Sequence, residues 1–467
     1  MLRARLFAAA GLAAMLGACS MAPAYAPPTV AVAPTFKETG SWTPASPEAE
    51  AQPRGEWWTV YGDATLNDLE ARAAKANPSL AAAAAAYDQA QALANQARGG
   101  LLPSIDGSAT AIRQRRSDNA PLRNGGPDDY STRQVGVTAS YEFDLWGRMR
   151  NLVATSGAQA QASAADLESV RLSLQAELAD DYLNLRGLDA QEKLLVDTAD
   201  AYGKALRLTQ IRHDGGAATG LDVGRAQTQL STAKAQISDI AAQRALYEHA
   251  IAALVGETAS SFSLPSAQIT FAQPRVPVGA PSTLLQRRPD IAAAERRAAA
   301  ANAQIGVAQA ARFPSLTLGG STGWQSAGGV DLLSAPNAFW MIAPQLAGSI
   351  FDDGRRKSGV EAAHAQFEQA AASYRGVVLG AFRDVEDQLA LANRLAYEAK
   401  DQNDAVEAAK RTEALAMIRY RQGAATYLEV VTAQTAALQA QRAALILNAR
   451  RLQASVDLTR ALGGGAG

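Results

Sequence analysis

The chain has 467 residues, a length that suits two or three ordinary domains or one extended architecture built twice. Aromatic residues make up only 6% of the chain and much of the 48% hydrophobic content is alanine, which favours long helices in thin layers over a thick core. The formal net charge is −1 with no basic cluster, and this excludes the electrostatic footprint of a nucleic-acid-binding protein.

The N-terminal segment has the pattern of a bacterial secretory signal. Two arginines precede an apolar run that is too short to span a membrane, and small residues follow it. Leu16–Cys19 resembles a lipobox, so we expect residues 1–18 to be a signal peptide and Cys19, the only cysteine, to be lipidated. Ser20 in place of Asp favours transfer to the outer membrane, as in bacterial lipoproteins. The alternative is an ordinary signal peptide followed by an incidental cysteine.

The remainder of the chain consists of a leader followed by two copies of an internal repeat. Residues 19–54 are rich in Pro, Ala and Thr without periodicity, which predicts a lipidated, extended and poorly packed leader. NPSLAAAA from Asn77 then aligns with RPDIAAAE from Arg288, and FDLWGR aligns with FDDGRR. We therefore expect a first repeat over 55–265 and a second repeat over 266–467.

Each repeat contains two segments with the period-two alternation of β-strands, at about 104–144 and about 315–352. Strands of about ten residues can cross a bilayer at a tilt, whereas no segment after the signal offers about eighteen uninterrupted apolar residues for a helix. Four strands leave two open edges, which cannot stay unpaired in lipid, so several chains are expected to share one closed barrel. A soluble sheet packed on the helices would remove this requirement.

A very long helix, a glycine break and a second long helix follow the strands of each repeat. The breaks read GGAATGLDV and QGAATYLEV, and their glycines Gly216 and Gly423 are 207 residues apart. Glycine fits a helix C-cap that needs a left-handed residue, and the threonine three residues later can cap the next helix. We predict two helical hairpins with tips near 213–221 and 420–428. The helices alone suit a soluble coiled-coil scaffold equally well.

Several stretches together resemble the outer-membrane efflux family, and in particular its lipoprotein branch in tripartite multidrug pumps. They are RPDIAAAERRAAAANAQIGVAQAARFPSL from Arg288, YEFDLWGRMRN from Tyr141, GEWWTVYGDATLNDLEARAAKANPSL from Gly55, and the terminal ALGGG. The resemblance covers the chain from Gly55 to its end. It implies an α+β membrane protein, a trimer whose twelve-stranded outer-membrane β-barrel takes four strands from each chain and continues as a twelve-helix periplasmic α-barrel.

The resemblance also implies a passive role and two protein partners. Such channels are exit ducts for drugs or other small toxic molecules, and their hairpin tips dock onto a periplasmic adaptor bound to an inner-membrane transporter, here expected to be proton-driven. The tip residues implied as adaptor contacts are Gly216, Ala217, Thr219, Leu221, Gly423, Ala424, Thr426 and Leu428. Closed family members narrow near the tips, and the candidates for such an aperture are Arg212, Asp222, Arg419, Tyr427 and Glu429.

The sequence does not indicate an enzyme, a cofactor or a nucleic-acid partner. Gly319–Gly323 matches the G-x-S-x-G pattern, but Ser321 lies in an alternating segment and not at a strand-to-helix elbow. His213, His249 and His364 have no partners at metal-ligand spacing. No phosphate-binding glycine motif is present.

The sequence therefore predicts a lipid-anchored outer-membrane channel with a large periplasmic part. Within transport, an outlet for type I protein secretion or for metal-ion efflux is an open alternative. From another class, a lipid-anchored periplasmic coiled-coil scaffold would share the helices and Cys19 but would not need bilayer-length strands.

Overall fold

The computed structural model describes residues 20–38, 55–119, 128–274, 276, 278, 287–327 and 331–464. The expected signal peptide and Cys19 lie outside these residues. No helix within the described ranges is both long and apolar enough to cross a membrane.

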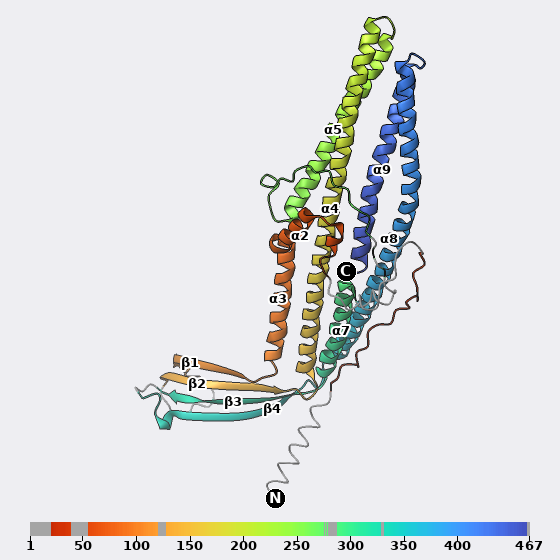
Figure 1. Cartoon of the computed structure of the whole chain (residues 1–467). Coiled ribbons are helices and arrows are strands. Elements are labelled where there is room, and N and C mark those ends of the chain that lie inside the picture. The colour runs from red at the N-terminus through yellow and green to blue at the C-terminus, as the bar shows by residue number, and fades with distance from the viewer. Residues whose placement is uncertain are drawn as a thin grey trace. The chain divides into compact units, whose positions relative to one another are not determined.

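The described chain consists of long helices and one small sheet (Figure 1). In chain order the elements are η2 (Trp57–Tyr61), α2 (Ala64–Ala76), α3 (Pro78–Gly99), β1 (Ser104–Arg115), β2 (Asp129–Phe143), α4 (Arg148–Asp214), α5 (Gly220–Leu254), α7 (Pro289–Ala310), β3 (Ser315–Ser326), η4 (Ala335–Asn337), β4 (Ala338–Ala347), α8 (Arg355–Arg421) and α9 (Tyr427–Ala461). Corresponding helices of the two repeats have equal lengths: 22 residues in α3 and α7, 67 in α4 and α8, and 35 in α5 and α9. The internal duplication is thus visible in the elements themselves.

The chain divides into two compact units that do not coincide with the repeats. The first unit comprises Met1–Thr29, Ala86–Ala164 and Ala293–Arg375, and the second comprises Val30–Ala85, Ala165–Ala292 and Gly376–Gly467. Each unit therefore takes segments from both repeats. The sheet belongs to the first unit and the helical hairpin ends belong to the second.

The sheet of the first unit is a four-stranded antiparallel meander in the order β1-β2-β3-β4 (Figure 1). Strands β1 and β2 come from the first repeat and β3 and β4 from the second, so the β2–β3 pairing joins the repeats. The register is continuous across the strands, for example Ile105 opposite Ala139, Ala139 opposite Gly320, and Gly320 opposite Ile342. The outer edges of β1 and β4 have no pairing partner within the described chain.

Because directly opposed residues share a face, the register assigns every strand residue to one of two faces. One face is apolar and includes Ile105, Val135, Val137, Ala139, Tyr141, Phe143, Leu316, Leu318, Trp324, Trp340, Ile342 and Leu346. The other is rich in hydroxyl, amide and small residues, including Ser104, Ser108, Thr110, Gln134, Thr138, Ser140, Thr317, Ser321, Gln325 and Gln345. This is the alternation of a strand with lipid on one side and water on the other.

Aromatic side chains lie at both ends of the apolar face. Tyr141 and Phe143 lie near the helix end of β2 and contact each other edge to face, with ring centroids 5.1 Å apart. Trp324 and Trp340 lie near the loop ends of β3 and β4 and are 39% and 77% exposed. At about 3.3 Å per residue, the six-residue step from Leu318, opposite Tyr141, to Trp324 spans roughly 20 Å along the strand.

The second unit contains the turn ends of two hairpins, α4–α5 and α8–α9, which both carry their turns at the same end (Figure 1). At the other end, α5 and α9 finish on glycines with positive φ, Gly256 at 76° and Gly463 at 87°. A Cβ on Gly256 would lie 2.5 Å from the Ala76 carbonyl oxygen, and one on Gly463 would lie 2.8 Å from the Arg287 carbonyl oxygen. Glycine is required at both positions by backbone conformation and by close approach.

The leader differs from the expected poorly packed segment. In the first unit the Ser20 hydroxyl donates to Asn151 Oδ1 (3.1 Å) and the Tyr25 hydroxyl donates to Glu295 Oε1 (2.6 Å). In the second unit Phe36 is only 7% exposed and packs with Val278, Val385 and Leu389. The described leader is extended, but it is bound along the body by hydrogen bonds and by a buried aromatic ring.

Candidate functional site

The two hairpin turns have the same backbone geometry. Gly216 and Gly423 have φ of 74° and 76°, as the glycine positions predict. Ala217 N–H donates to the Arg212 carbonyl (2.7 Å) and Gly216 N–H to the His213 carbonyl (2.9 Å). In the second turn, Ala424 N–H donates to the Arg419 carbonyl (2.8 Å) and Gly423 N–H to the Tyr420 carbonyl (3.0 Å). Both turns are therefore Schellman caps, which satisfy the last free carbonyls of α4 and α8.

A capping box starts each return helix. The Thr219 hydroxyl accepts from Asp222 N–H (3.2 Å), and the Asp222 carboxylate accepts from Thr219 N–H (3.1 Å). Thr426 and Glu429 form the same reciprocal arrangement at the start of α9. The threonine of each turn therefore caps the return helix, as expected, and the acid three residues later takes part in the cap.

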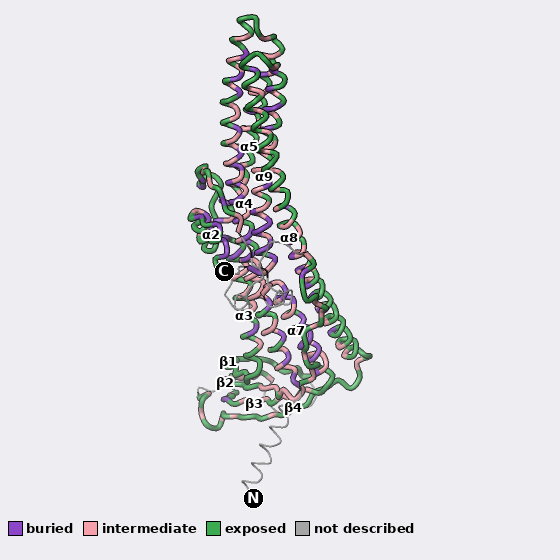
Figure 2. The backbone as a smooth tube through the Cα atoms, turned by 45° about the vertical axis from the view of Figure 1, so that its right-hand side comes forward, coloured by how far each residue is buried: buried purple, intermediate pink, exposed green. Residues whose placement is uncertain are grey.

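All eight predicted tip residues are exposed, and the turn ends are green in Figure 2. Two of the eight, Leu221 and Leu428, have large apolar side chains, which are 63% and 49% exposed. Ile211 (69%) and Ile418 (48%) are exposed in the last turns of α4 and α8. Each hairpin end thus exposes two large apolar side chains near a rigid cap.

The hairpins contact each other through an arginine and two tyrosines. Arg212 Nη1 donates to the Tyr420 carbonyl oxygen (2.7 Å), and its guanidinium lies 4.6 Å from the centroid of the Tyr420 ring. Tyr420 packs on Tyr427 with ring centroids 5.3 Å apart, and both rings are buried with Val430 and Ala226. Burial raises the pKa of the Tyr427 hydroxyl to about 12. We name Arg212, Tyr420 and Tyr427 the hairpin clasp.

The five aperture candidates fall into two groups. Arg212 bonds to Tyr420 of the second hairpin and Tyr427 is buried with Ala226 of the first, so both lie between the hairpins. Asp222, Arg419 and Glu429 instead pair within their own turns. Arg419 Nη2 donates to the Ala424 carbonyl (3.1 Å) and lies 3.7 Å from Glu429. Tyr420 was not among the residues predicted from the sequence, although the two tyrosines seven residues apart around the turn were a usable signal.

Among the positions at which the turns differ, two change how each turn closes, namely His213 against Tyr420 and Gly220 against Tyr427. Where the second turn has Tyr420 on Tyr427, the first has His213 Nδ1 3.0 Å from the Ala218 carbonyl oxygen, with Gly220 beside the imidazole ring. A Cβ on Gly220 would lie 3.9 Å from His213 Cε1. The first turn therefore closes on itself through an imidazole, and the second closes through an aromatic pair.

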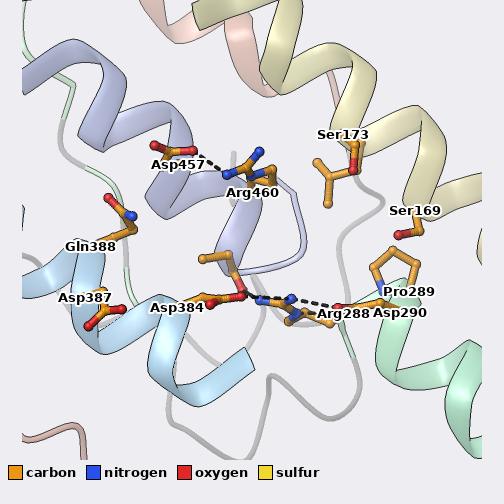
Figure 3. A pocket seen from close by; sticks show the side chains of 12 residues that line it. Ser169, Ser173, Arg288, Pro289, Asp290, Asp384, Asp387, Gln388, Asp457 and Arg460 are labelled. Carbon is orange, nitrogen blue, oxygen red and sulfur yellow. Dashed lines mark hydrogen bonds and ion pairs between the residues drawn. The ribbon is translucent and has the colours of Figure 1, made fainter. Parts of the chain in front are cut away.

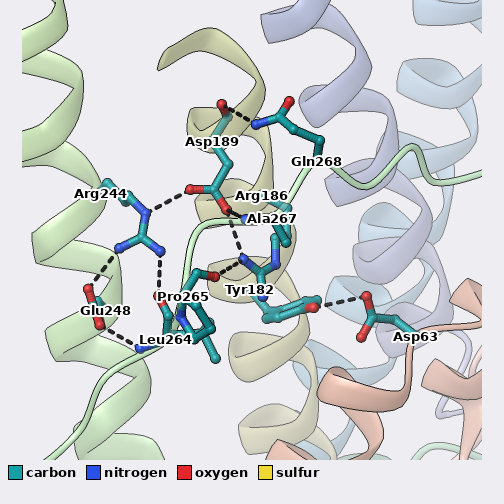
Figure 4. Close-up of polar contacts among 10 residues, drawn as sticks. All are labelled: Asp63, Tyr182, Arg186, Asp189, Arg244, Glu248, Leu264, Pro265, Ala267 and Gln268. Carbon is teal, nitrogen blue, oxygen red and sulfur yellow. Dashed lines mark hydrogen bonds and ion pairs between the residues drawn. The ribbon is translucent and has the colours of Figure 1, made fainter. Parts of the chain in front are cut away.

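A buried ionic network braces the hairpin α4–α5 further along (Figure 4). Asp189 is fully buried and accepts from Arg244 Nε (2.7 Å), Arg186 Nη1 (2.8 Å) and Ala267 N–H (3.1 Å). The two arginines also donate to the carbonyls of Leu264 and Pro265. Burial alone would raise the pKa of Asp189, but these hydrogen bonds outweigh it and the pKa is lowered. The network fixes the segment after α5 onto both helices.

A polar pocket lies where α7 begins beside the end of α9 (Figure 3). Arg288 is held by Asp290 (2.7 Å), Asp384 (3.5 Å) and the Ala461 carbonyl (3.1 Å), and Arg460 pairs with Asp457 (2.6 Å). The pocket is lined by Ser169, Leu172, Ser173, Arg288, Pro289, Asp290, Asp384, Asp387, Gln388, Asp457, Arg460 and Ala461. Since both arginines bind neighbouring carboxylates, we assign this cluster a structural role in tying α9 to α7.

The G-x-S-x-G segment does not form a nucleophile elbow. Ser321 lies in the middle of β3, opposite Thr138 and Met341, and no helix follows it directly. Within the described ranges, no three His, Cys, Asp or Glu side chains come together as a metal site.

Comparison with known proteins agrees with this geometry. Residues 69–257 and 280–464 match the family described as outer membrane efflux protein, one match for each repeat. The chain belongs to this family. It is 34% identical over 446 residues to the pyoverdine export outer membrane protein OpmQ of Pseudomonas putida, covering 94% of this chain and 93% of that protein. It is 33% identical to the outer membrane protein OprJ of Pseudomonas aeruginosa, covering 97% of this chain and 94% of that protein.

A solved structure extends the likeness to the fold. The outer-membrane channel OprN is 28% identical, with a TM-score of 0.86 over 96% of this chain and 100% of that one. The fold of this outer membrane efflux protein is therefore that of the family's trimeric channels, in which strands build a β-barrel and long helices build an α-barrel. The protein is an outer-membrane channel of an efflux system, as the sequence analysis predicted.

Proposed function

We propose that this protein is the passive exit duct through which a tripartite pump expels drugs or other small toxic molecules. The observation that carries the proposal is the four-stranded sheet with one apolar and one polar face and two unpaired edges. Edges cannot stay unpaired in lipid, so three chains are proposed to close one barrel around the polar faces. The duct performs no catalysis and needs no cofactor, because the inner-membrane transporter, proposed to be proton-driven, supplies the energy.

The periplasmic adaptor, in this proposal, docks on the hairpin turns. Two observations support this docking site: the turns are rigidly capped at Gly216 and Gly423, and Leu221 and Leu428 are exposed beside them. Apolar side chains on a preorganised backbone lose little conformational entropy on binding. Ala217, Thr219, Ala424 and Thr426 complete the proposed contact surface. In the resting state the hairpin clasp is proposed to hold the two hairpins of each chain together and so narrow the periplasmic end.

The anchor is proposed to be Cys19. Ser20, the next residue, is tied to Asn151 in the first turns of α4, close in sequence to the helix end of β2. A thioether-linked diacylglycerol on Cys19 with an acylated amine would give the two or more chains that firm membrane binding requires.

A complementation experiment tests the proposal. The chain is expressed with an adaptor and an inner-membrane transporter from its own organism in a strain that lacks its own outer-membrane efflux channel. We expect the loss of a preloaded fluorescent dye to recover. No recovery, with the protein correctly inserted and all three components present, would contradict the proposed role and favour an outlet for proteins or metal ions.

Cross-linking tests the docking surface separately. Since Cys19 is the only native cysteine, Ala217→Cys and Ala424→Cys place single thiols at the turns, and we expect a maleimide-bearing photoreactive probe on either to capture the adaptor. Ser238→Cys, exposed in the middle of α5, is the matched control. Equal capture from all three positions would argue against docking at the turns.

A further inference from the structure

The charged residues of the sheet are divided unequally between its two faces. The apolar face carries Arg113, Arg115, Asp129 and Arg133, all toward the loop ends of β1 and β2. On the polar face, the described strands carry only two charged residues, Asp106 and Glu142. The face that lines the barrel interior in the proposed function is therefore purely acidic.

Only one of these two carboxylates is uncompensated. Glu142 accepts two hydrogen bonds from Arg148, at 2.9 Å from Nε and 2.6 Å from Nη2. The Asp106 carboxylate is exposed, and the described residues give it neither a hydrogen-bond donor nor an ion-pair partner. Its backbone carbonyl, and not its carboxylate, accepts from the Thr138 hydroxyl (3.4 Å).

Asp106 also has no basic neighbour along its row of the sheet. The row that crosses all four strands at this level reads Asp106, Thr138, Ser321 and Met341. The flanking rows on the same face read Ser104, Ser140, Gly319 and Ala343, and Ser108, Gly136, Gly323 and Phe339. Its counterpart in the second repeat, counted from Pro103 and Pro314, is Thr317, so each chain contributes one such carboxylate.

We propose that Asp106 is the cation-selecting residue of the barrel, forming a ring of three carboxylates near its periplasmic mouth. This inference rests on the proposed function, because the ring requires three chains around one lumen. Rings of acidic side chains select cations by raising the local cation concentration and excluding anions. The duct would thereby pass cationic and neutral molecules more readily than anionic ones.

The dimensions allow such a ring to act across the whole lumen. Twelve strands spaced about 4.8 Å apart and tilted by about 40° give a backbone radius of about 12 Å, and the carboxylates project inward from it. The Debye length is about 10 Å at 0.1 M salt and about 3 Å at 1 M. The ring should therefore act at the pore axis at low salt and be screened at high salt.

The experiment measures reversal potentials of full-length trimers in planar bilayers under a KCl gradient. At about 0.1 M salt we expect Asp106→Asn to lower the potassium-to-chloride permeability ratio by at least about twofold, and Asp106→Lys to lower it further. The difference should shrink at about 1 M salt. Asp129→Asn, which removes an acid from the apolar face, is the matched control and should leave the ratio unchanged.

Thiol chemistry provides a second variant that does not depend on the asparagine substitution. Asp106→Cys should lose the preference for cations and regain it when an anionic thiosulfonate reagent modifies the thiol. Ile105→Cys, one residue away on the apolar face, should show no change with the same reagent.

The outcomes separate this inference from the proposed function. Trimers that form no pore even after the hairpin clasp is opened by Arg212→Ala and Tyr420→Ala would contradict the duct itself. Pores with the same permeability ratio in wild type, Asp106→Asn and reagent-treated Asp106→Cys would overturn the role of Asp106 and leave the duct standing.

Discussion

Asp189 shows how a single buried charge supports the second unit. Its two arginine partners, Arg186 and Arg244, are 3% and 14% exposed in their side chains. Arg244 also pairs with Glu248, so removal of the Asp189 carboxylate leaves the buried Arg186 guanidinium without its counter-charge. We expect Asp189→Asn to destabilise the protein by about 3–5 kcal/mol, measured by thermal unfolding followed by helical circular dichroism. Asp197→Asn, which removes the exposed pair with Lys193, should cost less than about 1 kcal/mol. Similar losses from both substitutions would contradict this account.

Glu70 differs from Asp189 because its carboxyl is buried without a partner, and its ionisation therefore destabilises the folded protein. It is 2% exposed, its Oε1 has no hydrogen-bond partner, and burial raises its pKa to about 9. A carboxyl with a raised pKa binds its proton more tightly in the folded state, so its contribution is fully present below its unfolded pKa and is lost as pH rises through the folded pKa. Between these values the wild type should lose up to about 1.4 kcal/mol of stability per pH unit.

Comparison of Glu70→Gln with wild type isolates this effect. We expect the variant to match wild type near pH 4 and to be the more stable protein at pH 8–9, judged from unfolding midpoints. Asp68→Asn removes an exposed carboxylate from the same helix and should not change the pH dependence. A parallel pH dependence for wild type and Glu70→Gln would show that this carboxyl is ionised in the folded protein.

Each hairpin turn needs a glycine at the end of its first helix, and substitutions at Gly216 and Gly423 can test this requirement. Alanine at Gly216 or Gly423 must adopt positive φ, which costs about 1–2 kcal/mol. Gly224 lies inside α5 with free space around it, so Gly224→Ala should stabilise the same hairpin by about 0.5–1 kcal/mol. Hydrogen exchange of amides near the turns measures both effects. Changes of the same sign would contradict the Schellman caps.

The turns were predictable from the sequence because their signals are local. Gly216 and Thr219, and Gly423 and Thr426, specify a cap and a restart within a few residues, and a very long helix was expected before each break, where α4 and α8 have 67 residues each. Strand β4 was less predictable, since it ends at Ala347, before the end of the expected strand region of about 315–352. Gly348 packs against Pro314 at that point, which no local pattern reveals.

The contacts that the sequence could not predict join residues far apart in the chain. Asp189 meets Arg244 across 55 positions, and Arg212 meets Tyr420 across 208. Phe36 lies in a segment whose composition is typical of a loose leader, yet its ring is buried by α8 and α9. Composition describes the average polarity of a segment, whereas the burial of a single ring, that of Phe36, determines whether the leader packs on the helices.

The assembly of the whole molecule is determined by the sheet, which is incomplete within one chain. Its apolar face, with aromatic side chains at both ends, needs lipid, and the free edges of β1 and β4 need other strands. A lipid-anchored coiled-coil scaffold would explain the long helices but would leave a sheet of this kind exposed in water. The duplication then supplies two hairpins to every chain, and so two turns to meet an adaptor.

The most direct test of the duct is to purify the full-length protein in detergent and measure its assembly and conductance together. We predict an SDS-resistant trimer that converts to monomer on heating and that forms stable ion-conducting pores in planar bilayers. A monomer, or a trimer without conductance after the hairpin clasp is opened by Arg212→Ala and Tyr420→Ala, would contradict the account.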